Sequence, residues 1–276
     1  MELHSATAIV TGSGRGIGRA IAQEFAARGT KVALAARTGT DLEHVAAQIA
    51  AAGGTALPVV TDVTAPQSVE DLMHRAEDEL GHIDILVNNA AIARCVGPLH
   101  QTDPDAWIED IQVNLIGYYH CLRAALPSML SRNRGCIINM IGGDSKPLPF
   151  LTSYNTAKTG VMRLTETLAL ELADTAINIF GMSPGFVHTG MTDYILESPD
   201  GRRWQGESTR QRLEQGLNVS PALAAAMAVE LASGKLDTLT GRAIRADKDD
   251  PEELARNAED IVKGGERVLR TVSFPE

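Results

Sequence analysis

Tyr154 and Lys158 are the residues of this sequence best suited to move a proton, since they stand four positions apart. On a helix, that spacing places two side chains on one face. A phenol titrates at about pH 10, so it is a poor acid or base at neutral pH unless a nearby cation lowers its pKa. We therefore expect Lys158 to lower the pKa of Tyr154. The pattern Y-x-x-x-K also arises by chance on surface helices, so its meaning depends on the elements that surround it.

The composition limits what those elements can be. The chain has 276 residues, of which 44% are hydrophobic and 22% charged, and this predicts one globular domain with a large core. The formal net charge of -10 argues against nucleic acid as a partner. Cys95, Cys121 and Cys136 form no CxxC pair, and the seven histidines form no HxH or HExxH pattern, so we expect free thiols and no metal site. We also expect no signal peptide and no membrane span, and hence a cytoplasmic protein.

A glycine-rich turn follows the first predicted strand. Ala6–Thr11 is a short β-rich apolar run, Gly12, Gly16 and Gly18 follow it, and a helical pattern then runs to Gly29. In a strand, glycine turn and helix arrangement, backbone N–H groups and the helix N-terminus can accept a pyrophosphate. The alternative is a tight turn between strand and helix that binds nothing.

The end of the second predicted strand, Lys31–Ala36, bears on the choice of dinucleotide. An acidic residue there would bind the ribose hydroxyls of NAD, whereas an arginine accommodates the 2'-phosphate of NADP. This chain has Arg37, and Arg15 in the glycine turn is a second candidate cation. The sequence therefore favours NADP(H) over NAD(H). The alternative is that both arginines are simply solvated.

Further strands alternate with helical segments along the chain. Ala56–Val60 and Ile83–Val87 are apolar runs, and helical patterns of 12 to 16 residues separate the strands. This alternation predicts an α/β fold with a parallel sheet and a ligand site at the carboxyl ends of the strands. Asp62 follows the third strand, where it could accept a hydrogen bond from an adenine amino group or cap the next helix.

Three motifs in this order resemble the short-chain dehydrogenase/reductase family of Rossmann-fold oxidoreductases. They are T-G-x-x-x-G-x-G at Thr11 to Gly18, Asn88 to Ala91 in place of N-N-A-G, and Y-x-x-x-K at Tyr154 and Lys158. The resemblance implies a doubly wound fold with a central, mostly seven-stranded parallel sheet and helices on both faces. It also implies a single domain over residues 1–276. Ala91 places a methyl group where the family has glycine, near the cofactor.

The resemblance also assigns roles to single residues. Tyr154 would be the general acid or base, Lys158 would tune it, and Asn114 would hold a water that relays protons through Lys158. The alternative for Asn114, within the long helix expected over residues 105–131, is a hydrogen bond to backbone in the core. The residues that would bind the cofactor are Gly12, Ser13, Arg15, Gly16, Ile17, Gly18, Arg37, Asp62, Val63, Asn89, Ala90, Tyr154, Lys158, Pro184, Gly185, Val187 and Thr189.

The usual catalytic serine of the family is missing. Its expected positions after the fifth strand hold Ile141 and Gly142, which have no hydroxyl. Loss of one donor to a developing oxyanion costs on the order of 10²- to 10³-fold in rate. Ser145 is our candidate for the role; backbone N–H groups of Gly142 and Gly143, a protonated Asp144 and an already activated substrate are alternatives.

Two segments lie outside these motifs. Residues 188–219 lack strand periodicity and stand where the family has its substrate loop. This segment carries four arginines that could attract an anionic group or simply be solvated: Arg202, Arg203, Arg210 and Arg212. Residues 247–276 form a tail in which Asp250 and Pro251 predict a helix start, and for its acidic cluster we expect capping rather than calcium. The end of the tail could pack on a neighbour or cover the pocket.

Together these features predict an NADP-dependent oxidoreductase that interconverts a carbonyl (ketone, aldehyde or quinone) and an alcohol. The resemblance implies a small-molecule substrate and a homodimer or homotetramer. The alternative is a relative that binds the cofactor with little or no redox turnover and acts as a regulatory or partner protein.

Overall fold

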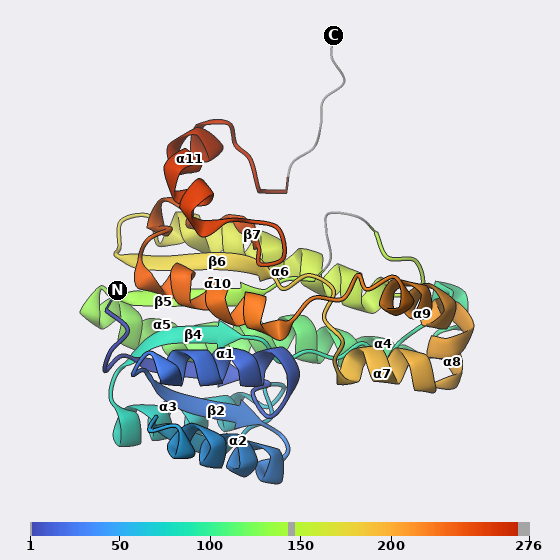
Figure 1. The fold of residues 1–276 in the computed structure, drawn as a ribbon, viewed down its shortest axis with the longest axis horizontal. Helices are drawn as coiled ribbons and strands as arrows, with labels where there is room; N and C mark the ends of the chain where they lie inside the picture. The colour runs from blue at the N-terminus through green and yellow to red at the C-terminus, as the bar shows by residue number, and fades with distance from the viewer. Residues whose placement is uncertain (1, 143–146, 270–276) are drawn as a thin grey trace.

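The computed structural model describes residues 2–142 and 147–269 and contains one sheet of seven parallel strands (Figure 1). The strands lie in the order β3-β2-β1-β4-β5-β6-β7. Their bounds are β1 (Thr7–Thr11), β2 (Lys31–Ala36), β3 (Ala56–Val60), β4 (Ile83–Asn88), β5 (Gly135–Met140), β6 (Ile177–Ser183) and β7 (Ala243–Arg245). The chain reverses its direction of travel across the sheet between β1 and β4, where doubly wound folds bind their ligands. The predicted Rossmann fold is confirmed.

The strands are buried because helices cover both faces of the sheet. Every residue of β1, β4 and β5 is buried, as expected for parallel strands built from continuous apolar runs. The helices that pack on the sheet are α1 (Gly16–Ala27), α2 (Gly39–Ala51), α3 (Pro66–Leu80), α5 (Gly117–Arg132), α6 (Thr152–Glu171) and α10 (Pro221–Ser233).

Two clusters of buried side chains divide these helices between the faces. One cluster joins α1, α2 and α10 to the sheet through residues such as Phe25, Val45 and Leu231. The other joins α3, α5 and α6 through residues such as Leu72 and Met129. The molecule therefore has three layers, and the strand ends remain open between them.

The helix expected over residues 105–131 is divided. α4 (Pro104–Ile111) passes into a π-helical turn, η2 (Gln112–Ile116), and then into α5. Asp103 caps α4 by accepting a hydrogen bond from the backbone N–H of Asp105. Pro127 lies within α5 on its exposed side, so the irregularity of this helix falls at the π turn, directly before Gly117, and not at the proline.

The segment between β6 and β7 is helical at the place where a substrate loop was expected. It contains α7 (Gly190–Glu197), the single turn α8 (Pro199–Gly201), the π-helical turn η3 (Arg202–Gly206) and α9 (Glu207–Glu214). In Figure 1, α7, α8 and α9 lie together beyond the carboxyl ends of the strands. They therefore form one wall of the space that these strand ends leave open.

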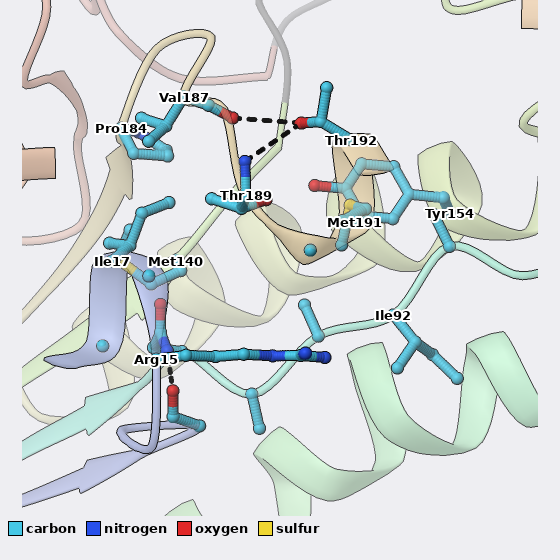
Figure 2. Close-up of a pocket in the computed structure, with 18 of the residues that line it drawn as sticks. Arg15, Ile17, Ile92, Met140, Tyr154, Pro184, Val187, Thr189, Met191 and Thr192 are labelled. Atoms are coloured by element: carbon cyan, nitrogen blue, oxygen red, sulfur yellow. Dashed lines mark hydrogen bonds between the residues drawn. The ribbon is translucent and has the colours of Figure 1, made fainter. Parts of the chain in front are cut away.

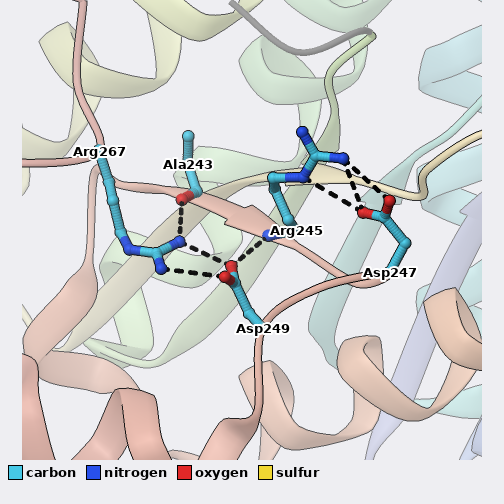
Figure 3. A network of polar contacts seen from close by, with 5 residues as sticks. All are labelled: Ala243, Arg245, Asp247, Asp249 and Arg267. Carbon is cyan, nitrogen blue, oxygen red and sulfur yellow. Dashed lines mark hydrogen bonds and ion pairs between the residues drawn. The ribbon is translucent and has the colours of Figure 1, made fainter.

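The C-terminal segment packs on its own chain. The predicted helix is α11 (Pro251–Lys263), and Asp250 caps it by accepting a bond from the backbone N–H of Glu253. Arg267 pairs with Asp249 at 2.6 Å and donates from its guanidinium to the carbonyl of Ala243 in β7 at 3.3 Å (Figure 3). The backbone N–H of Ala243 donates in turn to the carbonyl of Arg267. The acidic residues thus cap the helix and pair with arginines. The described part of the tail covers β7.

Neither a membrane-spanning helix nor a metal-binding cluster occurs in the described ranges. None of the helices there is long and apolar enough to cross a membrane. Likewise, no three His, Cys, Asp or Glu side chains in residues 2–142 and 147–269 gather in a way that could hold a metal ion.

Candidate active site

A pocket of about 830 Å³ opens at the carboxyl ends of the strands (Figure 2). Sixteen of the seventeen residues assigned to cofactor binding line it: Gly12, Arg15, Gly16, Ile17, Gly18, Arg37, Asp62, Val63, Asn89, Ala90, Tyr154, Lys158, Pro184, Gly185, Val187 and Thr189. The remaining one, Ser13, is fully buried in the glycine turn. Segments far apart in the sequence therefore meet around one cavity.

The glycine turn is shaped by close approach of the backbone to a neighbouring motif. Gly12 has a φ of +66°, which favours glycine. A Cβ on Gly18 would lie 2.4 Å from the carbonyl oxygen of Gly12 and 2.5 Å from Nδ2 of Asn89. Asn89 itself donates from Nδ2 to the carbonyl of Thr11 at 2.8 Å. The motif after β4 thus packs directly on the turn and holds it in place, and only glycine fits at position 18.

The ends of β2 and β3 bring three charged residues to the same side of the pocket. Arg15 and Arg37 line it and form no ion pair within residues 2–142 and 147–269. Asp62 accepts from the backbone N–H and the hydroxyl of Thr64, at 2.9 and 2.7 Å. Burial pushes the pKa of Asp62 upward, but the bonds from Thr64 and the charge of Arg37 lower it overall. Asp62 therefore stabilises a turn before α3, and it also faces the pocket.

Tyr154 lies in the first turn of α6, and a buried carboxylate fixes the start of that helix. Asp110 of α4 accepts from the hydroxyl of Ser153 at 2.6 Å and from the backbone N–H groups of Arg94 and Cys95 at 3.0 and 3.2 Å. Burial raises the pKa of Asp110 despite these bonds. Asp110 thus ties the loop after β4 to the residue that precedes Tyr154.

The environment of Tyr154 corrects one expectation. Its side chain lines the pocket, and desolvation by the surrounding protein raises its pKa to about 12, with a smaller contribution from the charge of Asp110. Lys158 was expected to lower this pKa. Its Nζ atom lies 5.9 Å from the centre of the Tyr154 ring, and burial lowers the pKa of Lys158 itself to about 7. Burial therefore outweighs the pairing in the protein alone.

Lys158 is hydrogen-bonded to groups that lie outside the three sequence motifs. Its Nζ donates to the hydroxyl of Tyr118 at 2.8 Å and to the carbonyl of Met140 at 2.9 Å. Tyr118 stands four positions after Asn114, across the π turn. That spacing was the available signal, but a tyrosine in an apolar helix pattern is commonly a core residue.

Asn114 is fully buried in the π turn and does not line the pocket. Its Nδ2 donates to the carbonyl of Ile92 at 2.7 Å, and its Oδ1 accepts from the N–H of Ile92 at 3.0 Å. The side chain thus binds backbone in the core, as one of the two interpretations expected, and anchors the loop after β4. The proton relay stays a prediction.

The P-G stretch after β6 enters the pocket between the strand ends and α7. Gly185 has a φ of +81°, and a Cβ there would lie 2.6 Å from Cβ of Asp247. Thr189 and Thr192 form a capping box at the start of α7, and the Thr192 hydroxyl donates to the carbonyl of Val187 at 3.2 Å (Figure 2). These contacts fix the backbone from which Val187 and Thr189 face the cavity.

Comparison with known proteins shows the family to which this chain belongs. The family model described as short chain dehydrogenase matches residues 6–200. The chain belongs to the short-chain dehydrogenase family. It is accordingly an NAD(P)-dependent oxidoreductase with a Rossmann fold.

Three relatives illustrate the range of the short-chain dehydrogenases that it resembles. The short chain dehydrogenase pigC of Monascus ruber is 32% identical over 95% of this chain and 85% of its own length. The 3-oxoacyl-[acyl-carrier-protein] reductase FabG of Haemophilus influenzae is 37% identical over 69% of this chain and 77% of its own. A crystal structure of an actinorhodin polyketide ketoreductase variant with NADPH has a TM-score of 0.78 at 27% identity, covering 87% of this chain and 95% of that one.

The pocket fits the dinucleotide that short-chain dehydrogenases use. Four glycines of the turn line the cavity and bring the backbone to its surface: Gly12, Gly14, Gly16 and Gly18. The Ser13 hydroxyl is buried there, and no described residue forms a hydrogen bond with it, so a polar ligand can satisfy it. Arg15 and Arg37 supply cations on the pocket wall. A phosphate-bearing ligand is the group that this combination suits.

Gly142 stands where short-chain dehydrogenases usually carry the catalytic serine, and the structure shows how closely it approaches the phenol. A Cβ at Gly142 would lie 2.7 Å from the Tyr154 hydroxyl and 3.0 Å from Cγ of Lys158. Ser145, the candidate replacement, lies outside the described residues, as do Gly143 and Asp144.

The pocket wall near Tyr154 includes apolar side chains, and one of the predicted cations lines the same cavity. Tyr154 and Met191 pack against the same small cluster, which includes Leu151. Among the four arginines considered from the sequence, Arg212 alone lines the cavity, with its guanidinium 3.9 Å from the centre of the Phe186 ring. Burial lowers the pKa of Arg212.

Proposed function

We propose that this oxidoreductase uses NADP(H) to interconvert a small-molecule carbonyl, such as a ketone, aldehyde or quinone, and the corresponding alcohol. The observation that carries the proposal is that Tyr154 and Lys158 line the same cavity as the glycine turn. A proton donor and a dinucleotide cradle in one pocket are the two parts that carbonyl reduction needs. The reductase and ketoreductase relatives support this class of substrate.

When bound, the nicotinamide would supply or accept the hydride. Tyr154 then has the role of the acid that gives its phenolic proton to the carbonyl oxygen during reduction. Burial raises the pKa of the phenol to about 12, so it keeps its proton at neutral pH, and a positive charge beside it has to lower that pKa for efficient proton transfer. In alcohol oxidation the same group has to act as base, and a nearby positive charge favours that step.

Lys158 is the nearby cation. It donates two hydrogen bonds, to the Tyr118 hydroxyl and to the Met140 carbonyl, and an ammonium group has three donors. One donor is thus left for a ligand in the pocket that Lys158 lines. We propose as that ligand the ribose of the nicotinamide half or, as the start of a proton relay, a water held by Asn114.

A second donor to the carbonyl oxygen is needed because position 142 offers no hydroxyl. We propose that it comes from the chain that follows β5, either from the Ser145 hydroxyl or from backbone N–H groups beginning at Gly142. A preorganised donor of this kind contributes a factor on the order of 10² to 10³ in rate.

We propose NADP(H) as the preferred cofactor because of two arginines on the pocket wall. The positions of Arg37 and Arg15 on the pocket wall, without a carboxylate partner in residues 2–142 and 147–269, support NADP(H) over NAD(H). The polyketide ketoreductase relative holds NADPH.

We also propose a homodimer or homotetramer, because Tyr119 and Leu130 on α5 and Leu170 on α6 are exposed apolar side chains. Free, buried cysteines support a reducing, cytoplasmic setting.

Tyr154→Phe tests the mechanism. The variant keeps the ring and removes the proton donor, so oxidation of NADPH by a panel of ketones, aldehydes and quinones is expected to fall at least about 10²-fold. NADPH affinity, followed by the fluorescence of the bound nucleotide, is expected to stay within about threefold. Retained turnover would refute the role of Tyr154. NADPH binding by the wild-type protein, with no carbonyl reduced, would instead favour the relative without redox turnover.

A further inference from the structure

Tyr118 is a second phenol beside the proposed catalytic pair, and its position is unusual for a tyrosine. It is 1% exposed and lies in a small cluster with Ile141, Val161 and Met162, between α5, β5 and α6. Its hydroxyl accepts from Nζ of Lys158 at 2.8 Å and donates to the carbonyl of Met140 at 3.2 Å. Since Lys158 also donates to that carbonyl at 2.9 Å, the three groups close a triangle of hydrogen bonds.

The elements around Tyr118 hold it there. The π turn η2 precedes α5 directly, and Gly117 lets α5 approach Val63, since a Cβ on Gly117 would lie 2.7 Å from Cγ2 of that valine. Lys158 extends toward Tyr118 from α6, on the opposite side. Its Nζ lies 4.5 Å from the centre of the Tyr118 ring, compared with 5.9 Å for Tyr154. The ammonium group is thus placed between two phenols and is closer to Tyr118.

We propose that Tyr118 is a positioning residue that holds the Lys158 side chain and stabilises its protonated form. The phenol oxygen accepts a hydrogen bond from the amine, which favours the charged state. The bond also fixes the flexible lysine stem, leaving one donor directed to ligands. This inference rests on the proposed function of Lys158 but concerns a residue to which that function assigns no part.

The charge state of Lys158 is sensitive to such a contact. Burial lowers the pKa of Lys158 to about 7, so the amine is near its midpoint at neutral pH. Other titratable groups lie near the two phenols. Besides burial, Tyr154 on α6 and Cys121 on α5 raise the pKa of Tyr118, and Asp110 on α4 raises the pKa of Tyr154. Burial raises the pKa of both Tyr118 and Cys121, so these two stay neutral at pH 7, and Asp110 faces Tyr154. A single hydrogen bond to the amine can therefore shift its titration.

Tyr118→Phe provides the test, because it removes one oxygen and keeps the packing of the ring. The chain has six lysines, so Lys158 can be followed by NMR of protein labelled with carbon-13 at the lysine ε position. Its signal is assigned as the one missing in Lys158→Met. In the cofactor-free protein, the titration midpoint of Lys158 is expected to fall by about one pH unit in Tyr118→Phe. Tyr119→Phe, the same change at the adjacent, 48% exposed tyrosine, is expected to leave it unchanged.

The pH dependence of the enzyme reaction provides a second test. In Tyr118→Phe, the alkaline limb of kcat/KM for carbonyl reduction is expected to move to lower pH by the same amount. The value of kcat at the optimum should change less than about threefold, unlike the collapse expected for Tyr154→Phe. An unchanged Lys158 midpoint in a folded Tyr118→Phe protein would overturn the proposal. Absence of turnover in the wild type would refute the proposed function alone, since the NMR titration still decides the role of Tyr118.

Discussion

Gly142 determines how close the backbone can come to the Tyr154 phenol. A Cβ at this position would lie 2.7 Å from the hydroxyl and 2.8 Å from Cε1 of Tyr154, and 3.0 Å from Cγ of Lys158. Contacts this short force one of the side chains to move. Tyr154 and Lys158 therefore pack so closely on position 142 that only a residue without a side chain fits there.

This packing leads to a prediction that runs against the family pattern. Gly142→Ser restores the usual hydroxyl, yet we expect it to lower kcat/KM for carbonyl reduction by about tenfold or more, because a small displacement of the reacting groups is costly. Steady-state kinetics of Gly142→Ser and Gly142→Ala measure the effect. The two variants should lose activity together, since both add the Cβ. A Gly142→Ser enzyme faster than the wild type would mean that the loop adapts and that a serine donor was missing.

Tyr154 and Lys158 were predicted correctly as residues of one site, but the effect of burial on their pKa values was not predicted. The spacing of Tyr154 and Lys158 predicted a pair on one face of a helix, and both line the pocket. Spacing carries no information on burial, which sets the pKa of each group. Tyr118 was overlooked for the same reason, since its contact with Lys158 crosses from α5 to α6 and involves 40 positions of sequence separation.

Among the elements, the parallel strands place their carboxyl ends side by side, so Arg37 after β2 and Asp62 after β3 share one edge. We predict that Arg37→Ala weakens NADPH binding by about 10- to 100-fold, the loss expected for a charge-assisted contact. NADH binding should change less than about threefold. Fluorescence titrations with both nucleotides measure the ratio, and Arg19→Ala, an exposed arginine of α1 outside the pocket lining, is the matched control. Equal losses for both nucleotides would contradict a 2'-phosphate contact.

The elements themselves were predictable where the signal was local and continuous. The strand and helix alternation gave the fold because buried parallel strands are continuous apolar runs, and Asp250 with Pro251 marked the start of α11. The π turn at Gln112–Ile116 was not predicted. It accompanies the pairing of Asn114 with the backbone of Ile92, a contact between distant segments that no window of sequence contains.

For the whole molecule, the buried amine of Lys158 makes folding stability depend on pH. The folded-state pKa of Lys158 is about 7, whereas an unfolded lysine titrates at about 10.4. Between these two values the unfolded chain binds more protons than the folded one, so the free energy of unfolding rises with pH. The phenols of Tyr118 and Tyr154 have raised pKa values and stay neutral over the lower part of this range.

We therefore predict that wild-type stability increases between about pH 7 and pH 9.5 relative to Lys158→Met, which carries no titratable group at this position. The difference in slope is expected to approach about 1.4 kcal/mol per pH unit, the limit for one proton. Urea unfolding of the cofactor-free proteins at several pH values measures it, and the subtraction removes contributions from the other ionisable groups. Parallel pH profiles for the two proteins would mean that Lys158 keeps an ordinary pKa in the folded state. In that case its amine would be fully charged at neutral pH.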